Sequence, residues 1–443
     1  MGKTFYIVNL GCSKNQVDGE TILALMEKRG WKYTGLEMAD VVIINTCGFI
    51  NDAKEESINT ILNCRSSYPD KIVIAAGCLA QRYGKELAQE MTEADGFVGN
   101  RDLYAVPDAV ERIVKGRTRL VSPAAPEPDC FVERNTLFTF PRSTYIKIAE
   151  GCNNNCTYCA IPLIRGQLRS IPADIIIKEI KSFIKKGFFE INLVSQDLAS
   201  WGIDIGQDLI YLLKRICRLK GDFRIRLLYM HPDRFNPEIL PIIGGDSRLL
   251  PYFDIPFQHA SEPILKAMGR KGNKEKYLKL ISTIRQALPD SVIRSTMMLG
   301  FPGEKEADFQ CLMDFLKEAR LDWCGFFTYS REEGTKAFSL GDRVPIATAG
   351  LRKEQAQELQ NSITEKRLES YVGKEIEVLV EELIAEEEIA LGRGYMNAPE
   401  VDGAVILHSG KAADGGIKPG DVICAKVVKR NNIDLEAVDV RLS

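Results

Sequence analysis

The sequence predicts an α/β protein with three regions: an N-terminal parallel-sheet βαβ domain, a central partial (βα) barrel of TIM-like type, and a small C-terminal antiparallel β-barrel. Short apolar runs alternate with helical patterns over residues 4–91 and again over residues 143–319. This alternation is typical of parallel sheets covered by helices. After residue 372 the pattern changes to short strands separated by turn residues, which is typical of a small barrel.

The composition is that of an ordinary globular protein. The chain has 443 residues, of which 45% are hydrophobic, and a net charge of −3, so no global charge signature indicates a nucleic-acid partner. No apolar window of about eighteen residues appears, and the first residues run directly into a strand pattern, so we expect a cytoplasmic protein without a membrane contact. We expect the twelve cysteines to be metal ligands and buried thiols rather than disulfides.

Three cysteines follow the predicted strands of the N-terminal region. Strands are expected over residues 4–10, 40–45 and 71–75, with helices near residues 17–28, 52–65 and 80–91, and Cys12, Cys47 and Cys78 come just after the strands. The carboxyl ends of parallel strands meet at one edge of a sheet, so these thiols can converge there. A single cysteine after a strand would be read as a small core residue. Three at equivalent positions favour a ligand set.

A second group of cysteines opens the central region. Cys152, Cys156 and Cys159 are separated by three and then two residues, and the next cysteine downstream is Cys217. A 4Fe–4S cluster normally takes four cysteine ligands, so three thiolates leave one iron open to an exchangeable ligand. A zinc knuckle is the alternative, but zinc sites usually combine two paired Cys or His units.

The central region follows a polar linker and again alternates strands with helices. Four prolines mark the linker, which also contains Cys130, a residue without a partner at motif spacing. About six βα units are expected, which place a site at the carboxyl ends of the strands. The expected strands are 143–149, 190–194, 223–228 and 292–299, and the expected helices are 173–186, 209–219, 274–287 and 306–319.

The central cysteines, with Tyr158 before the third of them, resemble the motif of the radical S-adenosylmethionine (SAM) superfamily. In that superfamily the open iron binds the amino and carboxylate groups of SAM. Together with Cys12, Cys47, Cys78 and the start Leu10–Asp18, the motif resembles the methylthiotransferase family, in its RimO-like branch, over nearly the whole chain. Gly19 departs from that branch, where serine is usual. The resemblance implies SAM and two 4Fe–4S clusters, the auxiliary one on Cys12, Cys47 and Cys78.

Further polar residues at the predicted strand ends are candidates for contacts with SAM. Ser195, Gln196 and Asp197 end one strand, and Arg226 and His231 flank another, where they could reach a carboxylate. The loop Leu299–Glu304 contains glycines that allow a ligand to approach the backbone, and in the family it lies near SAM. A structural hydrogen bond would explain each polar residue equally well. His259 and the segment 329–335 also match family motifs. The cofactor-binding candidates are Tyr158, Ser195, Gln196, Arg226, Gly300 and Glu304.

The C-terminal region begins with a helix predicted over residues 351–371 and capped by Gly373. Short strands follow at 375–380, 389–391, 405–407, 421–428 and 435–442, and the family places an OB-like TRAM domain here. We therefore divide the chain into residues 1–120, a linker at 121–142, residues 143–371 and residues 372–443. The other cysteines are expected to be small core residues: Cys64, Cys217, Cys311, Cys324 and Cys424.

The resemblance implies an enzyme that adds a methylthio group to the β-carbon of an aspartate in small-subunit ribosomal protein twelve. An unactivated C–H bond needs a radical, which the cofactor supplies while the protein positions it. The central cluster would cleave SAM, the auxiliary cluster would hold the sulfur species, and a second SAM would supply the methyl group. No acid–base pair is required to be catalytic. The expected partners are this ribosomal protein, free or on the ribosome, and an electron donor.

Charge in the C-terminal region bears on the choice of substrate. Residues 374–443 contain fourteen acidic and eight basic residues, and Glu381, Glu382, Glu386, Glu387 and Glu388 form an acidic run. An RNA-binding module needs the opposite sign, whereas an acidic surface attracts a basic protein. A solvated face without a partner is the plain alternative. The rival functions are a tRNA adenosine methylthiotransferase of the MiaB-like branch and a non-catalytic iron–sulfur electron carrier or RNA-binding scaffold.

Overall fold

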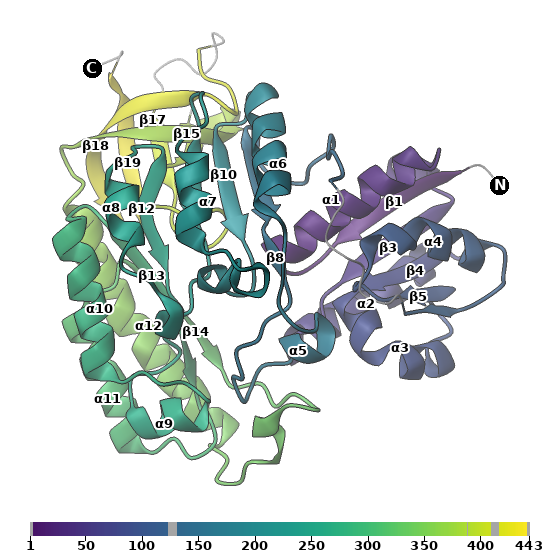
Figure 1. Ribbon diagram of the computed structural model, residues 1–443, viewed down its shortest axis with the longest axis horizontal. Helices are drawn as coiled ribbons and strands as arrows, with labels where there is room; N and C mark the ends of the chain where they lie inside the picture. The colour runs from purple at the N-terminus through teal and green to yellow at the C-terminus, as the bar shows by residue number, and fades with distance from the viewer. Residues whose placement is uncertain (1–2, 123–130, 388, 409–415, 441–443) are drawn as a thin grey trace.

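The computed structural model describes residues 3–122, 131–387, 389–408 and 416–440. Three main sheets divide the molecule, with the N-terminal sheet on one side and the central sheet and C-terminal barrel on the other (Figure 1). None of the helices within the described ranges is long and apolar enough to cross a membrane.

The N-terminal sheet has six parallel strands with helices on both faces, as predicted. One core cluster joins α1 and α4 to one face, and a second joins α2 and α3 to the other. Their buried residues alternate along β3, Val41 and Ile43 with the first cluster and Val42 and Ile44 with the second, as expected for a sheet covered on both faces. In spatial order the strands are β2 (Lys32–Tyr33), β1 (Thr4–Asn9), β3 (Val41–Thr46), β4 (Ile72–Gly77), β5 (Gly96–Val98) and β6 (Leu120–Val121), and the helices are α1 (Ser13–Lys28), α2 (Asn51–Ser67), α3 (Cys78–Glu90) and α4 (Val106–Val114).

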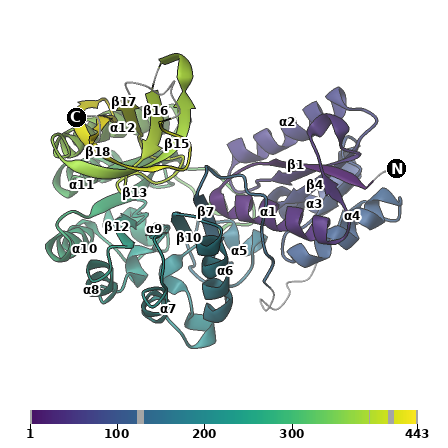
Figure 2. The same ribbon diagram turned by 90° about the horizontal axis from the view of Figure 1, so that it is seen from above.

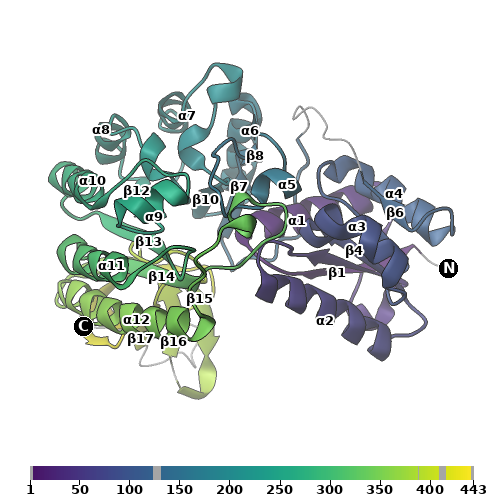
Figure 3. The same ribbon diagram turned by 90° about the horizontal axis from the view of Figure 1, so that it is seen from below.

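The central sheet is an open arc of six parallel strands, which confirms the predicted partial barrel (Figure 3). Each strand pairs with the next one of the sheet in chain order, and the helices cover its outer face. The strands are β7 (Ser143–Lys147), β10 (Glu190–Val194), β11 (Arg224–Leu227), β12 (Leu249–Asp254), β13 (Val292–Leu299) and β14 (Trp323–Thr328), and the main helices are α6 (Ala173–Lys185), α7 (Leu209–Ile216), α8 (Ile239–Gly244), α10 (Lys274–Ala287), α11 (Glu306–Ala319) and α12 (Ile346–Glu369).

The structure corrects the predicted C-terminal helix at both ends. Helix α12 begins at Ile346, directly after Pro345, rather than at residue 351. It ends at Glu369 with Ser370 as its C-cap, so Gly373 does not cap it. Gly373 instead has a φ of 86° and leads into the first strand of the barrel.

The C-terminal strands close into a five-stranded barrel, as predicted. One neighbouring pair, β17 with β19, runs parallel, and the other pairs are antiparallel. The chain turns at Pro419–Gly420, just before β18. In order around the barrel the strands are β15 (Glu375–Ile384), β16 (Ile389–Arg393), β17 (Val405–His408), β19 (Asp434–Asp439) and β18 (Val422–Asn431).

The barrel packs on the face of the central sheet that the helices leave open (Figure 2). Tyr252, Val292 and Trp323 of the sheet share one core cluster with barrel residues such as Val378. The Trp323 indole N–H donates to the Met396 carbonyl at 2.7 Å. The central and C-terminal regions are therefore joined by a continuous apolar core.

The cysteines that were expected to be core residues behave differently from one another. Cys64 is buried, and Cys217, Cys311 and Cys324 are partly buried. Cys424 is exposed, so its prediction was wrong, because side chains alternate along β18 and the neighbours Ile423 and Ala425 take the inward positions. Cys130 lies outside the described residues.

Candidate functional site

The central cysteines lie on a loop between β8 (Ala149–Glu150) and α5 (Ile161–Ile164). Backbone hydrogen bonds hold the loop at both ends, from Cys152 N to the Gly166 carbonyl at 3.2 Å and from Thr157 N to the Met268 carbonyl at 3.0 Å. Gly151 has a φ of 68°, and a Cβ there would lie 2.6 Å from the Gly166 carbonyl oxygen. Only glycine fits this close approach. The loop is thus a fixed platform that presents three thiols.

Burial makes the thiolate form of these cysteines costly in the protein alone. It is the main cause that raises the pKa of Cys152 to about 11 and the pKa of Cys159 to about 12, and the neighbouring Cys156 contributes to both shifts. The Asn154 backbone N–H points at the Cys152 sulfur at 3.4 Å and opposes this effect. A metal centre compensates such thiolates by direct bonding, so the donor set fits an iron–sulfur cluster.

Tyr158 lies on the same loop and is tied to the opposite wall of the arc. Its hydroxyl accepts a hydrogen bond from Arg270 Nε at 3.3 Å. Its ring meets Phe301 edge to face at a centroid distance of 6.4 Å, and Phe301 meets Tyr329 at 5.3 Å. This aromatic row connects the cysteine loop with the loop after β13 and the end of β14. Neither Arg270 nor Phe301 stands out in the sequence, because their partner Tyr158 lies more than a hundred residues away in the chain.

The end of β10 carries both engaged and free polar groups. Asp197 accepts hydrogen bonds from Asn154 Nδ2 at 2.7 Å and from the His231 backbone N–H at 3.0 Å, so it braces the cysteine loop. Within the described residues, Ser195 Oγ and Gln196 Oε1 are buried without a hydrogen-bond partner. Buried polar atoms are normally paired. These two atoms are therefore suited to a ligand that binds beside the cysteine loop.

Gly300 and Glu304 form a self-contained loop after β13. The Gly300 N–H donates to Glu304 Oε2 at 2.8 Å, and Arg352 Nη1 donates to Glu304 Oε1 at 2.7 Å. A Cβ at Gly300 would lie 2.5 Å from the Ala349 Cβ. Through these contacts Glu304 holds the loop against α12. The sequence had instead suggested that Glu304 contacts SAM.

Arg226 lies in the interface with the C-terminal barrel rather than at the strand ends. It is fully buried, and it donates to the Tyr395 carbonyl at 2.7 Å and to Glu190 Oε1 at 3.4 Å. Its guanidinium also lies over the Tyr252 ring, 4.6 Å from the centroid. Glu190 of β10 and carbonyl groups of the barrel occupy these donors, which does not favour the predicted contact with a SAM carboxylate.

The N-terminal cysteines meet at the carboxyl edge of their sheet. Cys12 caps α1, Cys47 follows β3, and Cys78 opens α3. Gly11 has a φ of 87°, and a Cβ there would lie 2.9 Å from the Cys47 Cβ, so a larger residue would push Cys47 away. Burial, Cys78 and Cys12 together raise the pKa of Cys47 to about 12. The three thiols are thus close enough to influence one another.

Positive charge accompanies this group. Packing around the sulfur acts to raise the pKa of the Cys12 thiol, but the charges of Lys14 and Arg165, together with backbone N–H groups of Lys14 and Asn15, outweigh it, so the pKa is lowered. Among the described residues, no three His, Cys, Asp or Glu side chains are arranged to chelate one metal ion. A cube makes a different demand, because each of its thiolate ligands binds a separate iron. Three neighbouring thiols with positive charge from Lys14 and Arg165 beside them fit such a cluster.

The N-terminal cysteine group touches the segment that follows the central cysteines. Cys78 packs against Ala160 and Ile164, which directly follow the central cysteines. Arg165 Nη2 donates to the Cys78 sulfur at 3.3 Å. Elsewhere in the interface, Glu332 Oε2 forms ion pairs with Arg82 Nη1 at 2.6 Å and with Lys54 Nζ at 3.1 Å. The fold therefore holds both thiol groups at one junction.

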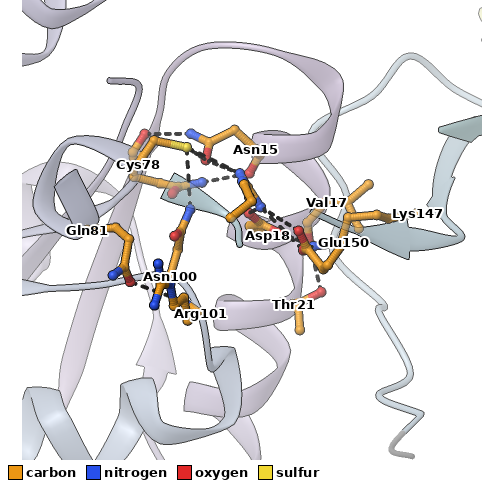
Figure 4. Close-up of polar contacts among 12 residues, drawn as sticks. Asn15, Val17, Asp18, Thr21, Cys78, Gln81, Asn100, Arg101, Lys147 and Glu150 are labelled. Atoms are coloured by element: carbon orange, nitrogen blue, oxygen red, sulfur yellow. Dashed lines mark hydrogen bonds and ion pairs between the residues drawn. The ribbon is translucent and has the colours of Figure 1, made fainter. Parts of the chain in front are cut away.

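A buried ionic cluster lies beside this junction (Figure 4). Asp18 of α1 pairs with Lys147 and with Arg165, and both cations also pair with Glu150 next to the cysteine loop. These charged side chains are mostly buried, so the stability of each charge depends on its ion-pair partners. They join the first helix of the chain to the start of the central sheet, a role that sequence spacing does not reveal.

Three family profiles match the chain, one for each of its three domains in order. Residues 4–99 match the profile described as Uncharacterized protein family UPF0004, residues 146–316 match the Radical SAM superfamily, and residues 372–440 match the TRAM domain. Among solved structures, the radical S-adenosylmethionine methyltransferase TsrM from Kitasatospora setae is similar, with a TM-score of 0.58 and 14% identity over 76% of this chain and 77% of that chain. This similarity concerns the fold.

Whole-length relatives are much more similar in sequence. A protein of Treponema denticola named ribosomal protein uS12 methylthiotransferase RimO is 48% identical over 97% of this chain and 99% of its own length. A protein of the same name from Thermodesulfovibrio yellowstonii is 40% identical over 99% of this chain and 100% of its own. The expected family is confirmed. With its radical SAM domain, its TRAM domain and these full-length relatives, the chain belongs to the RimO family of methylthiotransferases.

Proposed function

We propose that this protein adds a methylthio group to the β-carbon of an aspartate in ribosomal protein uS12, using SAM and two 4Fe–4S clusters. The observation that carries the proposal is the meeting of two three-cysteine groups from two domains at one interface. One such group would suffice for SAM cleavage alone. A second group beside it supports an enzyme that also inserts sulfur.

Cys152, Cys156 and Cys159 are the proposed ligands of the first cluster. When bound, this cluster and SAM supply the radical that breaks an unactivated C–H bond. The protein fixes the loop through Gly166 and Met268, and it offers Ser195 Oγ and Gln196 Oε1 as free polar atoms near it. We place the polar groups of SAM against these two atoms, with Tyr158 closing the side of the site toward Arg270.

Cys12, Cys47 and Cys78 are the proposed ligands of the auxiliary cluster, which holds the sulfur to be transferred. Their thiols share one sheet edge, and Lys14 and Arg165 bring positive charge to it. Positive charge favours the thiolate form that binds metal. The short path from Cys78 to the loop of Cys159, through Ala160, supports a reaction in which both clusters serve one substrate.

The surface of the C-terminal barrel supports a basic protein as substrate. Glu382, Glu386 and Glu387 are exposed. Glu381 is not part of this surface, because it pairs with Arg393 at 2.6 Å, and Glu388 lies outside the described residues. An acidic surface repels an RNA backbone and attracts a ribosomal protein that binds RNA through basic residues. We further propose that the protein acts in the cytoplasm, takes electrons from a separate donor and can meet uS12 on the ribosome.

Mass spectrometry of a deletion strain tests the substrate. The aspartate of uS12 should lose its methylthio group, and the intact gene should restore it, whereas a gene encoding Cys152→Ala, Cys156→Ala and Cys159→Ala should not. Methylthio-adenosine in bulk tRNA should be unchanged in all strains. Loss of that tRNA nucleoside with uS12 still modified would reverse the proposal in favour of a tRNA methylthiotransferase.

A further inference from the structure

Arg165 connects the central domain to a thiol of the N-terminal domain. It follows α5 and is 3% exposed. Its Nη1 donates to Asp18 at 2.6 Å, and its Nη2 donates to the Cys78 sulfur at 3.3 Å and to Asn15 Oδ1 at 3.4 Å. Three N-terminal residues thus share one guanidinium that belongs to another domain.

The charges around Arg165 balance one another until Cys78 is counted as a thiolate. Lys147 and Arg165 face Asp18 and Glu150, so two cations balance two carboxylates inside the interface. Figure 4 shows Asp18, Lys147 and Glu150 close together, with Cys78 and Asn15 beside them. A Cys78 thiolate adds a further negative charge, and Arg165 is the cation in direct contact with it.

Cys78 differs from the other two cysteines in where its hydrogen bonds come from. Cys12 and Cys47 receive hydrogen bonds from backbone N–H groups of residues two or three positions further along the chain. The Cys78 sulfur instead receives side-chain donors, Arg165 Nη2 and Asn100 Nδ2, both at 3.3 Å. Of these two donors, only Arg165 is charged and only Arg165 comes from the central domain.

Hydrogen bonds to sulfur and net charge set the reduction potential of an iron–sulfur cluster. A donor on a ligand sulfur stabilises the more negative, reduced state, and a fixed cation does the same. We propose that Arg165 is a positioning residue of the auxiliary cluster: acting through the Cys78 sulfur, it raises the reduction potential of that cluster when the two domains are docked. This inference rests on the proposed function, in which Cys12, Cys47 and Cys78 hold the cluster.

A redox titration followed by electron paramagnetic resonance tests the inference on the full-length chain. Replacing Cys152, Cys156 and Cys159 with alanine leaves the auxiliary cluster as the source of the signal. In this background, Arg165→Gln removes both charge and donor, so the midpoint potential should become more negative. Arg165→Lys keeps the charge but not the forked donor, so its midpoint should lie between the other two.

Arg134 provides a matched control. It is 2% exposed and also bridges α1 to the central domain, through Glu20 and Glu179, but within the described residues none of its hydrogen bonds goes to a cysteine. The Arg134→Gln and Arg134→Lys proteins should keep the parent midpoint. Iron content is measured first, and if Arg165→Gln retains no iron, the Arg165→Lys and Arg134→Lys pair decides the question.

The outcomes separate the two proposals. An unchanged midpoint in iron-loaded Arg165 variants overturns the role of Arg165 while leaving the cluster assignment intact. An equal shift in the Arg134 variants also overturns it, because the effect would then belong to the interface in general. A parent variant that binds no iron would overturn the auxiliary cluster itself, and with it both proposals.

Discussion

Glu304 illustrates how a residue in a ligand-like motif can serve the loop rather than the ligand. Both of its carboxylate oxygens are occupied, one by the Gly300 N–H and one by Arg352. Sequence spacing correctly pointed to the strand-end loop, but it could not show that Arg352, far along the chain, lies against it. The same holds for Arg226, whose partners come from the C-terminal barrel. Polar residues are hard to assign from sequence because their partners are set by tertiary contacts.

Replacing Arg352 with Met tests the structural role of Glu304. The change leaves a buried carboxylate without its cation, which should lower the free energy of unfolding by about 3 kcal/mol. Urea denaturation of the apoprotein measures this, with Lys353→Met at the next, exposed position of the same helix as control. Unchanged stability combined with weakened SAM binding would instead support the cofactor role predicted from sequence.

His231 should make stability depend on pH. Burial, with Arg270 and Arg234 nearby, lowers the pKa of this histidine from 6.5 to about 3. The folded chain therefore keeps the ring neutral where the unfolded chain protonates it, so stability is complete above pH 6.5 and falls as the pH drops toward 3. Between pH 7 and about pH 5 the loss should be about 2 kcal/mol.

The substitution His231→Asn removes the titrating group and keeps an acceptor for the Asp233 N–H. Urea midpoints of both proteins at the two pH values measure the effect. The variant should lose less stability on acidification than the parent chain. Equal losses in the two proteins would show that His231 does not carry the pH dependence.

At the scale of elements, the sequence pattern located most of the longer strands and helices, but it missed β12 and β14 of the central sheet and the short β2, β5 and β6 of the N-terminal sheet. The β12 sequence Leu-Leu-Pro-Tyr-Phe-Asp has no polar alternation and contains Pro251, and β14 contains Gly325. Strands covered on both faces do not alternate, so such short runs resemble loops or buried helix segments. The convergence of Cys12, Cys47 and Cys78 was easier to predict, because it follows from parallel strand order alone.

The turn after β1 offers a test of the N-terminal cysteine group. Gly11→Ala would place a Cβ against Cys47 at a φ of 87°, so we expect the iron bound by the auxiliary site to be lost. Anaerobically reconstituted protein should then hold about four irons instead of about eight. Gly30→Ala is the matched control, because Gly30 has a φ of 80° but no atom within 4 Å of the position that an added methyl group would take. Full iron content in Gly11→Ala would contradict the placement of the cluster.

At the scale of the whole molecule, the N-terminal domain is docked against the central arc. Glu332 is a buried bridge in this contact, since Arg82 and Lys54 of the N-terminal domain both pair with it. Glu332 lies in the segment 329–335, which matches a family motif in the sequence. Its ion pairs show what this segment does in the fold. It holds the two domains together beside the cysteine groups.

Replacing Glu332 with Gln should loosen this docking without removing either cysteine group. Hydrogen exchange should increase around Lys54 and Arg82, and methylthiolation of uS12 should fall by about tenfold or more, since a buried charge pair loses one member. Formation of 5′-deoxyadenosine should be largely retained. The neighbouring Glu333→Gln, an exposed side chain, should behave like the parent protein. Equal activity of the two variants would argue against a role of Glu332 in docking.

The central claim is that two cysteine groups, one in each domain, perform different parts of one reaction. The most direct measurement compares two full-length variants in an anaerobic assay that records both 5′-deoxyadenosine and methylthiolated uS12. Replacing Cys12, Cys47 and Cys78 with alanine should preserve SAM cleavage and abolish sulfur insertion. Replacing Cys152, Cys156 and Cys159 should abolish both. Loss of 5′-deoxyadenosine formation in a folded Cys12, Cys47 and Cys78 variant, or methylthiolated uS12 produced by it, would contradict the account.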